Sequence, residues 1–453
     1  MATHVLSLTD GTTTYTLTSE PYFLEEYTPG YPSLGNDGEY EPIAETISLH
    51  VGYTSSASTA AIQNDVNNVE RMLQRARKRF ETGEGDRIYL QIQWANEVNT
   101  WRSEVLQGEV EINADTVRAW NQAMARLRIH IVRRPFWEGP ETLARMVQQY
   151  SGQSASEQTV GNYTEDNLYN FVEFSKTQIS GVLPTPAIIY LSNSFGAAAT
   201  RSYRSIYMAI GKFSDPSLFT HQYEAENATG LGSVVSDSSA SSGVGYRRFN
   251  SYTAESICSW PLTFRQEQTG RTYRVLARFR NYGTTVNSYA RVYLRNQNNS
   301  QGFWIGEEVF LDRSVTSSSF VDLGILPIPP AVRGSTSLTV NLAFAIRSAS
   351  TSYITVNLDF VQITPLDEYR VIRPAAFSLT ANQKIVDHGV DELTYVDAGS
   401  STLYPLDIGT GNYIHLYPGV AQRLYFSRMR TDGANLADFL NVKVYYRPRR
   451  LTL

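Results

Sequence analysis

A strict two-residue alternation is the feature that most constrains the fold of this chain. Large apolar residues occupy every second position from Leu338 to Ile346, and again from Ile354 to Phe360. Successive side chains of a β-strand point to opposite faces, so each run predicts a strand with one buried face. Similar runs recur along the chain with turn residues between them. This pattern predicts a mainly β protein built from several antiparallel β-sandwiches.

A helical period occurs in one long segment, residues 57–81. Its apolar residues recur every three or four positions, which forms a single stripe along a helix. These residues are Ile62, Val66, Val69, Leu73, Ala76 and Phe80. The later half is rich in Arg and Lys. We interpret this as a solvated face whose cations suit the C-terminal end of the helix dipole, with a subunit-interface role as the alternative.

Composition agrees with a β fold and excludes several classes of site. Charged residues make up 18% of the chain and aromatic residues 12%, with 29 Tyr. A charged fraction below the usual ~25%, with much Tyr and Val, favours strands. The single Cys258 excludes an internal disulfide framework and a Cys-based zinc or iron–sulfur site. The net charge of −5 gives no overall polyanion-binding signature.

The sequence gives no expectation of membrane insertion or of secretion. No apolar run approaches the ~18–20 residues that a membrane helix needs. The first residues, MATHVLSLTDG, lack the basic and apolar regions of a secretory signal.

No catalytic residue is predicted, and we expect a protein that is not an enzyme. The chain contains no nucleophile elbow, phosphate-binding loop, dinucleotide fingerprint, zinc-protease helix or EF-hand loop. Glu307 and Glu308 are adjacent on an expected strand, so they face opposite sides and cannot act as a pair across one bond.

The distribution of expected strands along the sequence divides the chain into four segments. Residues 1–150 are expected to form a β unit with the helix over 57–81. Residues 221–366 contain the densest alternation and form a separate unit. The flanking segments, 151–220 and 367–453, each have too few expected strands to close a sandwich alone.

One constellation within 221–366 carries a family resemblance. Tyr223–Ala228 reads Y-E-A-E-N-A, Ser236–Gly243 reads S-D-S-S-A-S-S-G, and Asn357–Ile363 reads N-L-D-F-V-Q-I. In this order and at this spacing, the segment resembles calcium-stabilised carbohydrate-binding modules, which have a jelly-roll β-sandwich fold. Their first and last strands are neighbours, so the ends of the module would lie close together, and this permits insertion into a loop.

The resemblance implies a structural calcium ion held by Glu224, Glu226 and Asp359. Glu224 and Glu226 are two residues apart, so they would share one face of a strand. Asp359 would lie on the polar face of the last strand, and three hard oxygen donors would then converge, as Ca²⁺ prefers. The alternative is an ordinary acidic strand edge.

The family's ligand cleft places aromatic faces against sugar rings, with a polar side chain nearby. Residues of these types on the expected loops are Tyr246, Trp260, Trp304 and Tyr353, with Asn357 as the polar contact. Tyr246 is the first choice because it follows the Ser/Gly turn, although this turn is one residue longer than in the family pattern. Each of the others fits a core or rim position equally well.

The flanking segments resemble the distal tail proteins of long-tailed phages and related tail-tube components. The resemblance rests on the exit R-R-P-F-W-E-G-P at 133–140 and on strand-like segments at 178–193 and 413–426. It implies an N-terminal domain that forms a hexameric ring, followed by a galectin-like sandwich, here interrupted by the module.

The expected function is therefore structural. The chain would be a virion protein of a phage tail tip or baseplate, assembled in the host cytoplasm with other phage tail proteins. It would form a homo-oligomeric ring and present the module to a host-surface glycan, while DNA passes the lumen without sequence-specific contact. The alternatives are a tail-tube protein with a decorating module and a glycoside-active enzyme with a binding module.

Overall fold

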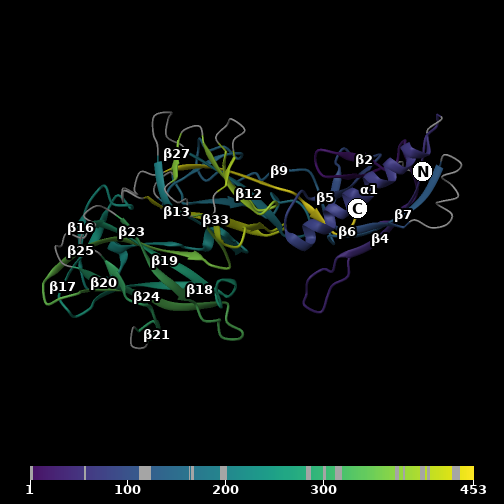
Figure 1. Cartoon of the computed structure of the whole chain (residues 1–453). Helices are drawn as coiled ribbons and strands as arrows, with labels where there is room; N and C mark the ends of the chain where they lie inside the picture. Colours follow the sequence, from purple (N-terminus) through teal and green to yellow (C-terminus); the bar gives the residue numbers. More distant parts are fainter. Residues whose placement is uncertain are drawn as a thin grey trace. The chain divides into compact units, whose positions relative to one another are not determined.

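The chain is mainly β in the computed structural model, with several sheets and, within the described residues, one α-helix (Figure 1). The structure describes residues 4–55, 58–111, 124–162, 164, 168–193, 201–281, 287–298, 302–311, 319–372, 377–380, 383–397, 403–405, 409–430 and 439–453. Two compact units are present. One comprises Met1–Thr142, Ser180–Leu183 and Arg447–Leu453, and the other Leu143–Ile179 and Pro184–Tyr446. No described helix has the length and apolar character needed to cross a membrane.

The first unit is a nine-stranded sheet with one helix on it. The strands follow the order β2-β1-β5-β6-β7-β4-β3, and β8 and β35 extend the sheet beside β6. Their bounds are β1 (His4–Thr9), β2 (Thr14–Thr16), β3 (Tyr22–Glu26), β4 (Ile43–Gly52), β5 (Ile88–Trp94), β6 (Trp101–Glu111), β7 (Met124–Arg133), β8 (Trp137–Glu138) and β35 (Arg449–Arg450).

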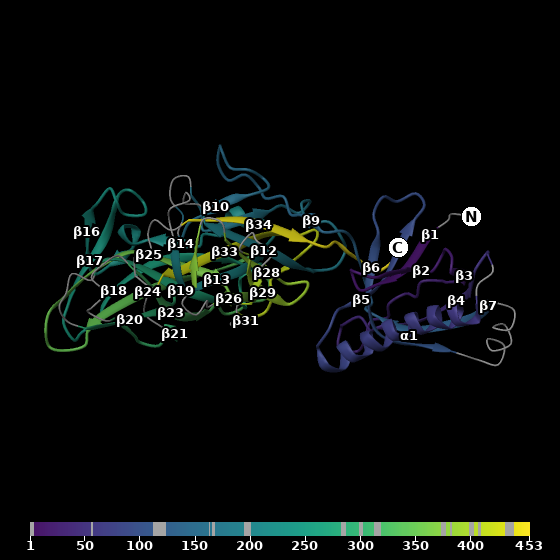
Figure 2. The ribbon, with the colours of Figure 1, turned by 45° about the horizontal axis from the view of Figure 1, so that its top comes forward.

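The helix α1 (Thr59–Thr82) lies within one or two residues of the predicted bounds. It begins at Ser58, whose side chain accepts a hydrogen bond from the Ala61 N–H, and it ends at Gly83 with φ 74°. Both are favoured capping residues. The helix lies along the sheet (Figure 2), and its apolar stripe packs against β4, β5 and β6. Phe80 is the exception to the predicted stripe, since it is 61% exposed at the last turn.

The second unit contains a sandwich whose strands come from both sides of residues 221–366. One sheet has the order β10-β34-β12-β28-β29-β30, with β9 and β32 at its side, and the other has the order β11-β33-β13-β26-β31, with β27. The bounds are β9 (Thr142–Leu143), β10 (Gln158–Val160), β11 (Phe171–Phe174), β12 (Thr185–Asn193), β13 (Arg201–Phe213), β26 (Glu368–Ile372), β27 (Phe377–Leu379), β28 (Lys384–His388), β29 (Leu393–Asp397), β30 (Leu403–Pro405), β31 (Gly409–Gly411), β32 (His415–Leu416), β33 (Ala421–Arg430) and β34 (Leu440–Tyr446).

A further sandwich follows β13 in the chain and precedes β26. Its two sheets have the orders β16-β17-β25-β19-β23, with β14, and β15-β18-β24-β20-β21, with β22. The bounds are β14 (Gln222–Glu224), β15 (Thr229–Gly230), β16 (Ser233–Ser236), β17 (Gly245–Ser251), β18 (Ser256–Arg265), β19 (Thr272–Asn281), β20 (Ser288–Arg295), β21 (Gly302–Ile305), β22 (Val309–Leu311), β23 (Ser319–Pro327), β24 (Ser337–Ser348) and β25 (Ile354–Pro365). We call it the inserted sandwich, and the one built from both flanks the host sandwich.

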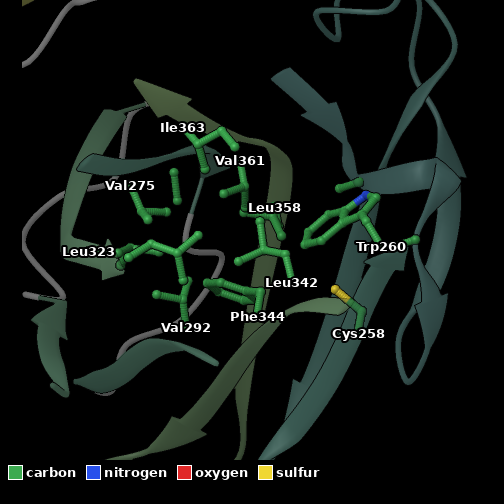
Figure 3. Close-up of a cluster of buried hydrophobic side chains, with 14 of the residues drawn as sticks. Cys258, Trp260, Val275, Val292, Leu323, Leu342, Phe344, Leu358, Val361 and Ile363 are labelled. Atoms are coloured by element: carbon green, nitrogen blue, oxygen red, sulfur yellow. The ribbon is translucent and has the colours of Figure 1, made fainter. Parts of the chain in front are cut away.

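The core of the inserted sandwich lies between its two sheets (Figure 3). The alternating apolar residues of β24, and those of β25 up to Leu358, point into it, as their two-residue period predicts. Phe360 ends the predicted run but packs in a separate cluster with Leu276 and Phe320, because the pairing of β25 with β19 shifts register at this point. The first and last strands are neighbours, since Gln222 of β14 pairs with Gln362 of β25. The two ends of this sandwich therefore lie side by side.

The same core extends into the host sandwich. Phe171, Phe213, Phe219 and Tyr425 are buried in one cluster with the inserted sandwich's apolar residues. The inserted sandwich is therefore packed onto its host and not merely tethered to it.

Polar groups are also buried at this junction. The His221 ring nitrogen Nε2 lies 2.8 Å from Asn170 Oδ1, and the amide of Gln362 donates to Gln222 Oε1 at 2.9 Å. Burial lowers the pKa of His221 to about 3, so this ring is neutral at physiological pH and needs no buried counter-charge.

Candidate metal and glycan-contact sites

The carboxylates predicted to hold calcium are only partly placed as expected. Glu224 ends β14, but Glu226 lies in a 3₁₀ turn, Ala225–Asn227, and not on the strand. The argument that the two share a strand face therefore does not hold, because the strand stops two residues before Glu226. Ser241 connects the first and last motifs instead: its hydroxyl donates to Glu224 Oε2, and its N–H donates to Asp359 Oδ1 at 3.2 Å.

Asp359 is neutralised by an arginine that the sequence reading did not identify. The Arg278 guanidinium lies 2.7 Å from Asp359 Oδ2, and both side chains are almost fully buried. Burial raises the pKa of Asp359, and the positive charge of Arg278 opposes this change. Arg278 is on β19, next to β25 in the sheet, and only that pairing brings the two residues together.

Glu224 is the most perturbed carboxylate of the group. Its pKa is raised to about 7, mainly by burial; hydrogen bonds from Ser241 and Gln222 lower it, and the nearby carboxylates of Asp359 and Glu226 raise it. A carboxyl group of this kind is partly protonated near neutral pH.

The cluster has the oxygen donors that calcium prefers, but most of these oxygens already have other partners. Glu226 Oε2 is buried without a hydrogen-bond partner, as an oxygen awaiting a cation would be. However, Arg278 already supplies a positive charge to Asp359, and both Glu224 oxygens accept hydrogen bonds. Among the described residues, no group of three or more His, Cys, Asp or Glu is arranged to hold a metal ion. A structural calcium ion therefore stays a prediction.

Two of the predicted glycan contacts, Tyr246 and Asn357, are brought together by Arg248. The Arg248 Nη2 donates to the Tyr246 hydroxyl at 2.9 Å, and its Nε donates to Asn357 Oδ1 at 3.2 Å. Tyr246 and Arg248 are two residues apart on β17, and Arg248 pairs with Asn357 across the strands, so the three share one sheet face.

This group offers mainly its arginine to solvent. Tyr246 is 8% exposed and Asn357 4% exposed, whereas Arg248 is half-buried. The signal for Arg248 in the sequence was its position two residues after Tyr246, on the same face of an expected strand.

The other predicted contacts lie elsewhere. Trp260 is 3% exposed in the core, where its indole N–H donates to the Glu224 carbonyl at 2.8 Å (Figure 3). Trp304 is on β21 in the opposite sheet and packs partly against the core. Trp260 therefore presents no face to a sugar, and Trp304 lies in the other sheet from Tyr246.

Tyr353 belongs to an exposed aromatic pair. It is 46% exposed in the connection from β24 to β25, and its ring meets that of Tyr252 edge to face with centroids 5.0 Å apart. The five predicted contacts thus do not converge on one cleft, and Tyr252 is an exposed aromatic residue that the sequence reading missed.

Comparison with known proteins finds no matching family model and no matching curated protein. Among solved structures, the chain is similar to the Dit protein of phage SPP1, described as a hub of the adsorption apparatus, at 9% identity, 99% coverage of both chains and a TM-score of 0.33. It is also similar to a family 35 carbohydrate-binding module from an environmental isolate, at 16% identity over 32% of this chain and 93% of that one, with a TM-score of 0.23. A tailspike protein of bacteriophage CBA120 matches at 13% identity over 34% of this chain and 20% of that one, with a TM-score of 0.20.

Proposed function

We propose that this chain is a structural protein of a phage tail tip or baseplate, carried in the virion and assembled in the host cytoplasm. Its first unit forms a homo-oligomeric ring, a hexamer, which joins other tail proteins. Its inserted sandwich holds a host-surface glycan. The observation that carries the proposal is the insertion itself: β13 and β26 are paired neighbours in one sheet, and a complete second sandwich lies between them in the chain.

The open sheet of the first unit supports self-assembly. Among the described strands, β2 and β3 end the strand order, and each pairs with one neighbour only. Edge strands carry backbone groups that can pair with another chain. Copies of the same sheet can therefore join edge to edge.

The arginine-centred group on β17 and β25 supports glycan contact. Arg248 presents guanidinium N–H groups beside a tyrosine hydroxyl and an amide, which together match the donors and acceptors of sugar hydroxyls. Several weak contacts of this kind on one ring would act together through avidity.

We expect Arg248→Ala and Tyr246→Ala to weaken glycan retention by the full chain on a glycan array. Losing a charged hydrogen-bond donor at a binding site costs about 1.5–3 kcal/mol, which is roughly tenfold or more in affinity. The matched control is Arg295→Ala, because Arg295 also covers a tyrosine, Tyr293, but on the opposite sheet. Unchanged retention in both test variants would refute this glycan site.

Images of the native assembly test the structural part of the proposal. A closed ring supports a distal-tail role, and a stacked tube would instead support the tail-tube alternative. A strict monomer at micromolar concentration by mass photometry would contradict both. The third alternative, a glycoside-active enzyme, has no support from the buried carboxylates, because Asp359 is held by Arg278.

A further inference from the structure

A cleft lies between the two sandwiches of the second unit, away from the arginine-centred group. Its cavity volume is about 730 Å³, within the size range of small-ligand sites. Strands β13 and β26 of the host sandwich form one side, and β19 and β23 of the inserted sandwich form the other. The residues that matter here are Tyr207, Tyr369, Arg274, Phe320, Asp322 and Ile325.

Two tyrosines of the host sandwich form an aromatic platform in this cleft. The rings of Tyr207 and Tyr369 are stacked, with centroids 6.3 Å apart and 26° between their planes. Tyr207 is 3% exposed, and its hydroxyl donates to the Pro365 carbonyl at 3.4 Å. Tyr369 is 39% exposed. One ring is therefore fixed as the floor, while the other is accessible to a ligand.

The inserted sandwich contributes a charge-balanced pair of polar groups. Arg274 donates to Asp322 Oδ2 from Nε at 3.1 Å and from Nη2 at 2.6 Å, and its guanidinium lies 4.2 Å from the centre of the Tyr207 ring. Asp322 Oδ1 accepts a hydrogen bond from the Gly324 N–H. Both side chains keep some exposure, 18% for Arg274 and 39% for Asp322.

Apolar groups line the rest of the cleft. Phe320 is nearly buried, whereas Ile325 is 53% exposed. The cleft thus combines apolar surface, an accessible aromatic ring, and a donor and an acceptor held side by side without net charge.

We infer that this cleft binds a neutral saccharide. A sugar ring has apolar C–H faces that pack on an aromatic ring, and neighbouring hydroxyls that can accept from Arg274 and donate to Asp322. Because the pair is already neutral, a charged ligand would leave one charge uncompensated as the cleft is desolvated. This site is separate from the proposed Arg248 site, and it needs both sandwiches.

The test measures retention of the full chain on an array of neutral glucose and galactose oligosaccharides, beside a set of acidic oligosaccharides. We expect Tyr369→Ala to reduce retention of the neutral set by about tenfold, the loss expected for one stacking contact. Ile325→Arg places a long charged side chain at an exposed position of the cleft and should abolish retention. Tyr31→Ala is the matched control, because Tyr31 is a more exposed tyrosine, at 79%, in the other unit.

The melting temperature of each variant shows whether it folds. If Tyr369→Ala is destabilised, Ile325→Arg provides the test of the cleft in its place. The inference fails if the neutral set is not retained, if only acidic sugars are retained, or if both cleft variants retain it like the parent chain. Retention lost in Tyr246→Ala but unchanged in both cleft variants would overturn the cleft and leave the proposed function standing.

Discussion

At the residue scale, one buried polar group should control how the stability of the inserted sandwich depends on pH. This group consists of Glu224, Ser241, Asp359 and Arg278. Ser241 contacts two carboxylates, and only one of these, Asp359, has an arginine beside it. Burial raises the pKa of the second carboxylate, Glu224, and so favours its neutral form.

We expect stability to fall as pH rises through this group. The pKa of Glu224 is raised from 4.5 to about 7, so the stabilising contribution is fully present below 4.5 and is lost as pH rises through 7. A change of this size corresponds to at most ~3 kcal/mol in the free energy of unfolding. Thermal melts of the full chain from pH 5 to pH 8 should show the decline, and Glu224→Gln should flatten it. Glu307→Gln, at an exposed carboxylate, should leave the decline unchanged.

Calcium provides a second residue-scale prediction. If the ion binds as the family resemblance implies, adding calcium at pH 8 should raise the melting temperature of the full chain, and chelation should reverse this. Ligand binding to the folded state stabilises it by an amount that grows with the logarithm of ligand concentration over Kd. Glu226→Gln should remove the effect, because this variant loses the carboxylate with the unpartnered oxygen. An identical melting temperature with calcium and with chelator would refute the site.

The sequence predicted that the two acidic motifs meet, but it did not predict which groups pair with their carboxylates. The motifs around Glu224 and Asp359 were correctly read as meeting, because the strands that carry them pair. Arg278 could not be predicted, since its contact with Asp359 depends on which strand lies beside β25. Trp260 shows the same limit: an aromatic residue near an expected turn fits a core or a cleft equally well until the pairing is known.

At the scale of elements, periodicity was a reliable guide where the runs are long. The alternation at Leu338–Ile346 lies in β24, that at Ile354–Phe360 lies in β25, and the helical stripe lies in α1. Short elements were missed because two or three residues cannot display a period. The 3₁₀ turn at Ala225–Asn227 and the two-residue strand β35 are of this kind, and β35 depends on pairing with distant β8.

The end of α1 gives a prediction at this scale. Gly83 has φ 74°, and a Cβ added there would meet no atom within 4 Å. Gly83→Ala should therefore cost only the conformational penalty of a left-handed residue, about 1 kcal/mol in the free energy of unfolding. Gly83→Asn should cost less, because Asn tolerates this conformation. Equal stability of all three chains in urea denaturation would contradict the assignment of this cap.

At the scale of the whole molecule, the main point is that the host and inserted sandwiches share a core. The sequence reading expected an insertion, with boundaries at 221 and 366. Phe219 lies outside that range, yet it is 4% exposed within the common apolar cluster. Its ring stacks on Tyr273 of the inserted sandwich and meets Tyr425 of the host edge to face.

We expect Phe219→Ala to destabilise both sandwiches together. Removing a buried phenylalanine costs about 3–5 kcal/mol, and the shared core means that one calorimetric transition should shift as a unit. Leu218→Ala is the matched control, since Leu218 is adjacent but 46% exposed. Two transitions, of which only one moves, would show that the sandwiches unfold independently.

The attachment between β13 and β26 also has a mechanical consequence. The inserted sandwich is joined to its host by two covalent connections that leave from paired strands, Ile210 opposite Glu368. If the sandwich binds a cell surface as proposed, a pull on its outer surface would be divided between these two connections, and neither end of the sandwich would be free to be peeled away.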